Sequence, residues 1–139
     1  MTLARNAAMT LAALLIGLAA FQLALAIGAP WGLAAFGGFV ERPGSALRVS
    51  AAVATLIWTG AALVILRRAG LPVWAPLPAA WLPVAVWVLA GLLALSIVVN
   101  AISPSVLEKS IWVPFGVVTT ALAVTVALKS KAAKPLQPR

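Results

Sequence analysis

The sequence contains no cysteine, histidine, tyrosine or aspartate, and its only carboxylate side chains are Glu41 and Glu108. Without cysteine the chain has no disulfide, no thiol redox relay and no thiolate nucleophile. Without histidine and aspartate, only the two glutamates can offer a metal ion a charged ligand. These absences argue against a metal enzyme, a histidine-ligated pigment site and a Ser-His-Asp hydrolase, and we expect no metal and no cofactor.

Charged residues are also scarce. They make up 9% of the 139 residues, whereas about 25% of the residues of a soluble domain are charged. Hydrophobic residues make up 64% of the chain, against roughly 45–50% in a soluble domain. A helix needs about 20 apolar residues to cross about 30 Å of hydrocarbon. The chain therefore accommodates four membrane-spanning helices with short connections and no separate soluble domain.

Four apolar runs predict these helices at about 7–29, 48–66, 81–99 and 111–128. We expect an all-α, up-down four-helix transmembrane bundle over residues 1–128, followed by a disordered cytoplasmic tail at 129–139. A signal peptide is the competing interpretation of the first run, because Arg5 precedes it. The apolar core of a signal peptide spans about 7–15 residues, whereas this run spans 23, so we interpret it as the first membrane helix.

Prolines and polar residues predict where the helices begin and end. Pro30 predicts that the first helix ends near Gly28, and Ser45 is a candidate N-cap of the second. We expect Asn100 to end the third helix and Pro114 to lie in the first turn of the fourth.

Two connections have unusual compositions. Residues 32–40 are apolar but too few to cross a membrane, and Gly37-Gly38 interrupts them. We expect this segment to lie along the interface or between helix ends. Residues 72–83 contain four prolines, which predict a stiff, extended loop.

The formal charge of +8 has a topological interpretation. In a soluble chain it would suggest nucleic-acid binding, but here the cations flank apolar runs, so we expect no nucleic-acid partner. With four spans, Arg42, Arg48 and Lys109 share one side. The other side holds the remaining seven cations: Arg5, Arg67, Arg68, Lys129, Lys131, Lys134 and Arg139. The excess predicts that both termini lie in the cytoplasm, and we expect a multi-pass protein of a bacterial plasma membrane.

The apolar runs contain few polar side chains, the strongest of which is Gln22, with Thr55 and Thr59 in the second run. We expect these groups to form hydrogen bonds between helices. No ionisable residue lies at mid-depth, although proton-coupled carriers depend on one there.

The two outward loops should bring several polar and aromatic side chains together. The candidates for a ligand site or for contacts between the loops are Trp31, Glu41, Arg48, Asn100, Ser103, Glu108, Lys109 and Trp112. Because charges near hydrocarbon are costly unless paired, we expect Arg48 to reach Glu108, or Glu41 to meet Lys109. Two interpretations stay open: a purely structural clasp between the loops, or a shallow pocket for an anionic or amphiphilic ligand. In the pocket, Arg48 would receive the charge, and Trp31 and Trp112 would form the walls.

The same loops carry a resemblance. The first part of the resemblance consists of GAPWG at 28–32, Gly37-Gly38, and Leu47-Arg48 with Ser50. Its second part is a set of polar and aromatic residues: Asn100, Ser103, Ser105, Glu108-Lys109, Trp112 and Pro114. In these motifs the chain resembles a family of small bacterial four-helix integral membrane proteins with no assigned activity. The resemblance implies that the outward loops are the shared feature, and it supplies no substrate, cofactor or catalytic residue.

We therefore predict a non-enzymatic structural or accessory membrane subunit, or a binder of a lipid-like ligand through the outward loops. Its expected partners are membrane lipids, with a homo-oligomer or a larger membrane complex left open. One alternative is a small oligomeric transporter or channel subunit with a polar path through Gln22 and the threonines of the second helix. Another is a lipid-acting membrane enzyme that uses Glu41 or Glu108.

Overall fold

Four long helices dominate the computed structural model of the chain, which describes residues 2–130. They are α1 (Leu3–Ala26), α2 (Ser45–Arg68), α3 (Leu82–Ala101) and α4 (Val106–Lys129), and the connections add three short 3₁₀ turns, η1 (Gly32–Ala34), η2 (Phe36–Gly38) and η3 (Ala79–Trp81). The described residues form no strand. Each long helix is apolar and long enough to cross a membrane, since the 20 residues of α3 extend about 30 Å and the 24 residues of each of the others about 36 Å. The all-helical, four-helix prediction is confirmed.

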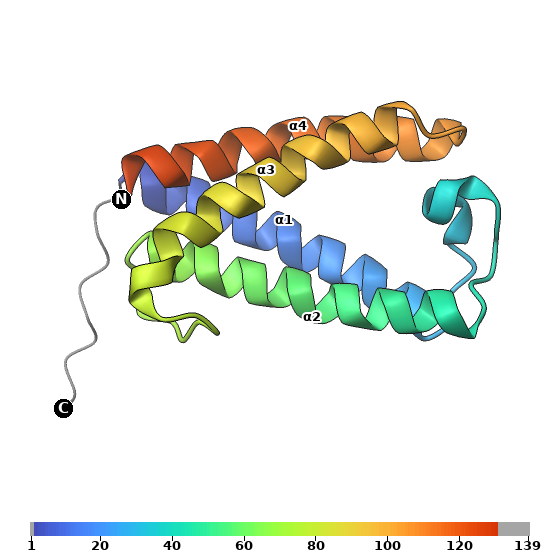
Figure 1. Cartoon of the computed structure of the whole chain (residues 1–139), viewed down its shortest axis with the longest axis horizontal. Coiled ribbons are helices and arrows are strands. Elements are labelled where there is room, and N and C mark those ends of the chain that lie inside the picture. The colour runs from blue at the N-terminus through green and yellow to red at the C-terminus, as the bar shows by residue number, and fades with distance from the viewer. Residues whose placement is uncertain (1, 131–139) are drawn as a thin grey trace.

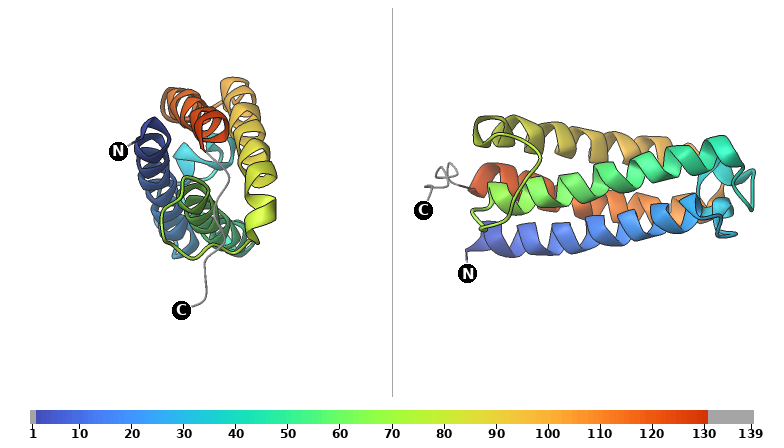
Figure 2. Two further views of the ribbon diagram at one scale, coloured as in Figure 1. Left: turned by 90° about the vertical axis from the view of Figure 1, so that its left-hand side faces the viewer. Right: turned by 90° about the horizontal axis from the view of Figure 1, so that it is seen from below.

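Consecutive helices run in opposite directions, so the bundle has two different ends (Figure 1). The start of α1, the end of α4 and the 69–81 connection lie at one end, which we call the terminal end. Residues 27–44 and 102–105 connect helices at the other, the double-loop end. Helix α1 packs on α2 and α4, and α3 packs on α2 and α4, as the end-on view shows (Figure 2).

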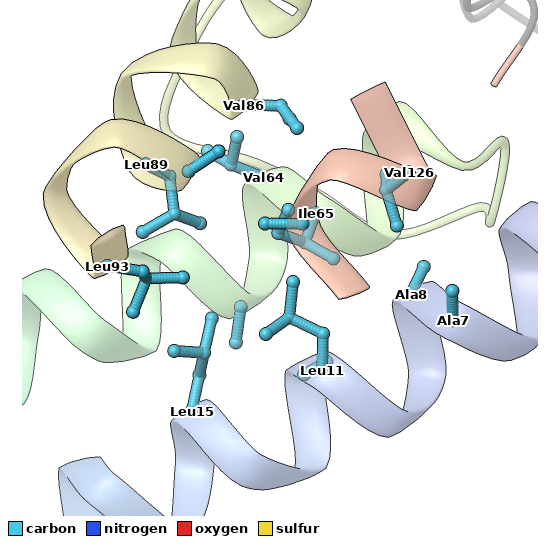
Figure 3. Packing of buried hydrophobic residues seen from close by; sticks show 14 of the residues in the cluster. Ala7, Ala8, Leu11, Leu15, Val64, Ile65, Val86, Leu89, Leu93 and Val126 are labelled. Carbon is cyan, nitrogen blue, oxygen red and sulfur yellow. The ribbon is translucent and has the colours of Figure 1, made fainter. Parts of the chain in front are cut away.

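The hydrophobic core occupies the terminal half of the bundle (Figure 3). Its largest fully buried side chains include Leu11 and Leu15 of α1, Ile65 of α2, Val86 of α3 and Val126 of α4. These residues come from the first half of α1 and α3 and from the last half of α2 and α4. Dense apolar packing therefore fixes the terminal half and leaves the double-loop half to other interactions.

The bounds of the first two helices differ from the prediction: α1 is shifted toward the N-terminus, and α2 is longer at both ends. Helix α1 begins at Leu3 because Thr2 caps it, its hydroxyl accepting from the Arg5 N–H at 3.4 Å. It ends at Ala26, before the predicted Gly28, because Gly28 adopts φ +95° and closes a left-handed C-cap in which Ala29 N–H donates to Ala24 O at 2.9 Å.

Helix α2 begins at Ser45, so the prediction of Ser45 as its N-cap is wrong. The cap is Gly44, whose carbonyl accepts the Arg48 N–H at 3.0 Å. The helix continues to Arg68, two residues past the predicted end.

The end of α3 and the start of α4 also differ from the prediction. Asn100 does not end α3, because its side-chain amide donates to Ser96 O within the helix at 2.8 Å, and α3 continues to Ala101. Helix α4 begins at Val106, five residues before the predicted start, because Ser105 caps it. Pro114 consequently lies inside α4 rather than in its first turn.

The remaining segments agree in part with expectation. Residues 71–78 contain no helix, and η3 directly precedes α3, whose first turn contains a proline. Lys129, which was expected in the tail, belongs to α4, and Ser130 is the residue that caps the helix. The rest of the predicted tail, 131–139, lies outside the described residues.

Candidate functional site

The start of α4 is built around Glu108. Ser105 is the N-cap, and its hydroxyl accepts the Glu108 N–H at 3.2 Å. The Ser103 hydroxyl accepts the Ser105 N–H at 3.1 Å and donates to the Glu108 carboxylate. A carboxylate in the first turn of a helix is favoured by the backbone N–H groups and the helix dipole there. This local geometry places a buried carboxylate, 6% exposed, at the double-loop end.

Residues 33–38, which include the turn η2, dock on this helix start through three long-range hydrogen bonds. The Gly37 N–H donates to Glu108 Oε1 at 2.8 Å. The Ser105 hydroxyl donates to Leu33 O at 3.1 Å, and the Trp112 indole N–H donates to Ala34 O at 2.6 Å. We call these three contacts the clasp. They confirm the expectation that the two loops meet, and they confirm that residues 32–40 lie between helix ends.

Gly38 is required for this docking. It adopts φ +75°, a conformation that residues with a side chain rarely take. A Cβ at this position would lie 2.7 Å from Cβ of Ser105. The interrupting glycines of the 32–40 segment therefore allow its backbone to approach α4 closely.

The expected ion pairs do not form among residues 2–130. Arg48 Nε donates to Ala26 O at 2.8 Å, at the carboxyl end of α1, where a cation is favoured by the helix dipole. Glu41 and Lys109 are exposed and make no ion pair with each other. The physical reason is that Glu108 receives a backbone N–H and a hydroxyl, which compensate its burial without a cation.

The two predicted wall tryptophans have different environments. Trp112 packs edge-on against Phe21, with ring centroids 5.0 Å apart, and against Phe115 at 5.6 Å. Trp31 stacks on Phe21 with a centroid distance of 6.2 Å, but it is 51% exposed. Trp112 belongs to the interior of the double-loop half, and Trp31 covers its edge.

A cavity of about 240 Å³ lies beneath the clasp. All four helices and the segment 34–36 contribute to its wall. The lining residues are Leu18, Phe21, Gln22, Ala34, Ala35, Phe36, Trp58, Leu93, Ser96, Asn100, Glu108, Trp112 and Phe115. Of the predicted loop residues, the structure brings Asn100, Glu108 and Trp112 to the cavity, whereas Trp31, Glu41, Arg48, Ser103 and Lys109 are outside its lining.

The polar groups of the interior also differ from expectation. Gln22 lines the cavity, and its amide makes no hydrogen bond with any residue in 2–130, so it does not join two helices. Thr55 and Thr59 donate to carbonyls of their own helix, at 2.9 and 2.8 Å, and do not line the cavity. The prediction of interhelical hydrogen bonds from these three residues is wrong.

The aromatic part of the lining was missed by the sequence analysis. Phe21, Phe36, Trp58 and Phe115 were not identified, although Trp112 and Phe115 are three residues apart and Glu108 and Trp112 are four apart. Residues with these spacings share one face of a helix. Once the helix is known to start at Val106, this periodicity places all three on the face of α4 that lines the cavity.

The cavity contains one ionisable side chain, Glu108. Its other polar groups are the Gln22 amide, the Asn100 amide and the Ser96 hydroxyl, which donates to Leu93 O at 2.7 Å. Within residues 2–130, no three side chains of the types that commonly bind metals gather in one place. The arrangement is that of a small, mostly apolar binding cavity with a few oriented polar groups.

No protein-family model, curated protein or solved structure matches this chain. The resemblance of the two loops to a family of small bacterial membrane proteins therefore stays a prediction.

Proposed function

We propose that the chain is a non-enzymatic integral membrane protein that binds a lipid-like ligand in the cavity beneath the clasp. The observation that supports this most is the Gln22 amide, which faces the cavity without a hydrogen-bonding partner in the described chain. Gln22 is half-buried, so its amide borders the cavity and stays accessible to a ligand there. A ligand that hydrogen-bonds this amide would also cover the apolar side chains of the cavity wall.

The apolar outer surface of the bundle supports the membrane assignment. Large hydrophobic side chains such as Leu56 (74% exposed), Ile57 (58%) and Leu95 (58%) point away from the core, and contiguous exposure of this kind is unusual in a soluble monomer. We place the protein in a bacterial plasma membrane with both termini in the cytoplasm, because seven of its ten cations belong to the terminal side. The double-loop end then faces outward.

The position of the cavity favours an amphiphile over a soluble metabolite. It lies between the helices, near one end of segments long enough to cross a membrane, where a lipid headgroup meets its chain. Drug-sized ligands occupy roughly 300–1,000 Å³, so about 240 Å³ suits a headgroup-sized part of the ligand. Arg48 was expected to receive the charge of an anionic ligand, but it lies outside the lining and has no such role in the proposed cavity.

Neither alternative function is favoured by an observation. A channel through one copy would need a polar path, but Leu11, Leu15, Ile65 and Val126 close the terminal half with apolar side chains. An enzyme would need an acid–base pair or an activated nucleophile at the cavity, whose lining includes Glu108 as its single ionisable group. An accessory role within a larger complex is compatible with ligand binding.

Native mass spectrometry of protein extracted in a mild detergent tests the proposal. We expect a small molecule to be retained by the wild type and by Leu23→Trp, and to be lost from Leu18→Trp. Both substitutions add the same volume to α1, but Leu18 lines the cavity and Leu23 is 50% exposed. Thermal unfolding of both variants controls for loss of the fold. Equal retention by the folded variants, or no retained molecule in the wild type, would contradict ligand binding in this cavity.

A further inference from the structure

The charge and hydrogen-bonding character of the cavity indicate the class of ligand. Its single ionisable group is Glu108, whose carboxylate accepts from Gly37 N–H and from the Ser103 hydroxyl. Each carboxylate oxygen has a further lone pair that can accept. A negatively charged group in the wall of a mostly apolar cavity attracts a cation more strongly than it would in water.

The remaining polar groups of the lining also mainly accept. The Asn100 amide uses its N–H on Ser96 O, which leaves its own carbonyl oxygen without a partner in the described chain. The Ser96 hydroxyl uses its proton on Leu93 O, which leaves its oxygen lone pairs. The free donors of the lining are the Gln22 amide, the Trp58 indole N–H and the second N–H of the Asn100 amide, and none of them carries a charge. A ligand that satisfies this set must itself carry N–H or O–H donors.

Aromatic rings complete the wall. Phe21, Phe36, Trp58, Trp112 and Phe115 all line the cavity. The faces of aromatic rings attract cations, with tryptophan the strongest, and aromatic cages recognise organic ammonium groups. No cation at this end of the bundle repels such a ligand from the cavity wall, because Arg42, Arg48 and Lys109 are all outside the lining. Arg48 instead donates to Ala26 O.

We propose that the cavity beneath the clasp recognises an organic ammonium group on a short apolar chain, with Glu108 accepting its N–H donors and the aromatic rings surrounding its charge. This inference rests on the proposed ligand-binding function and specifies its chemistry. The volume of about 240 Å³ is smaller than the roughly 300–1,000 Å³ of pockets for drug-sized ligands. The group that enters is therefore of the size of a small alkylamine or the amine-bearing end of a larger amphiphile.

The test compares three probes of one shape and different charge: hexylammonium, hexanol and hexanoate. Calorimetric titration of the full-length protein in maltoside micelles, corrected for empty micelles, gives each affinity, and maltoside headgroups carry no charge or amine that would compete. We expect hexylammonium to bind at least about tenfold more tightly than hexanol, because one hydrogen bond to a charged group contributes about that factor in affinity. Hexanoate should bind more weakly than hexanol.

Two variants with matched controls locate the effect. Glu108→Gln should abolish most of the preference for hexylammonium over hexanol, whereas Glu41→Gln, which changes the other, exposed carboxylate, should keep it. Because Glu108 also holds the clasp, Trp58→Leu serves as a second variant that removes an aromatic wall and leaves the clasp intact. Trp58→Leu should reduce the same preference, and Trp74→Leu, at a residue 71% exposed outside the lining, should not.

The outcomes separate the two proposals. If hexanol or hexanoate binds as tightly as hexylammonium, the ammonium proposal is overturned, while ligand binding in the cavity stands. If hexylammonium is preferred but the preference survives in both Glu108→Gln and Trp58→Leu, the cation binds elsewhere and the proposal is also overturned. If no probe binds, the ammonium proposal fails, and the proposed function fails with it only when native mass spectrometry also finds no retained molecule.

Discussion

The clasp makes a quantitative prediction for Ser105→Ala. This substitution removes one hydroxyl that makes two hydrogen bonds. As the N-cap of α4, the hydroxyl accepts the Glu108 N–H at 3.2 Å, and it donates to Leu33 O at 3.1 Å. Loss of an N-cap costs about 1 kcal/mol. The bond to Leu33 lies in an exposed setting and contributes at the low end for a hydrogen bond, about 0.5 kcal/mol. We expect the free energy of unfolding to fall by about 1.5 kcal/mol.

Equilibrium unfolding in mixed maltoside and dodecyl sulfate micelles measures this change. Ser110→Ala is the matched control, because the Ser110 hydroxyl is exposed and donates within its own helix to Val106 O at 2.8 Å. It should change stability by less than about 0.5 kcal/mol. Hydrogen exchange at the Gly37 amide should accelerate in Ser105→Ala and not in Ser110→Ala. Equal, small effects of the two substitutions on stability and on exchange would refute the docking of residues 33–38 on α4.

Three further substitutions test other parts of the structure in the same unfolding assay. Gly38→Ala should destabilise by at least about 1 kcal/mol, because alanine is strained at φ +75° and its Cβ would meet Ser105; a neutral effect would contradict the close approach. Leu11→Ala should cost about 2–5 kcal/mol, since Leu11 is 0% exposed, and Leu56→Ala, at 74% exposed, should cost far less. Arg48→Ala should lower the free energy of unfolding by about 0.3–1 kcal/mol, the contribution of a cation at a helix end. A decrease of about 3 kcal/mol or more would instead indicate that Arg48 forms a buried ion pair.

The sequence predicted the architecture because long apolar runs have few physical solutions. Four apolar runs with prolines between them predicted four helices and the end of the bundle at which each connection lies. The helix ends were less predictable. Gly28 ended α1 through its left-handed conformation rather than through Pro30, and Ser105 started α4 well before the apolar run begins. Caps depend on single side chains, which a hydrophobicity pattern does not register.

The meeting of the two loops was predicted, but the interactions that join them were not. Charge pairing was expected because Glu108 would otherwise be buried without compensation, but a backbone N–H from a loop 71 residues away supplies it instead. A sequence does not indicate which backbone donors a fold will bring near a side chain. The cavity forms where Phe21 of α1, Trp58 of α2 and Phe115 of α4 face one another's helices. Their meeting depends on how each helix is rotated relative to the others, which the periodicity of a single helix does not give.

Residues 33–38 dock on the start of α4 and form part of the cavity wall. The most direct test is a nuclear Overhauser measurement on the isotope-labelled protein in micelles, directed at the indole proton of Trp112, which lies on the nitrogen 2.6 Å from Ala34 O. We expect cross-peaks from this proton to Ala34 and Ala35. Cross-peaks from the Trp112 indole to water or detergent, and none to residues 33–38, would contradict the account.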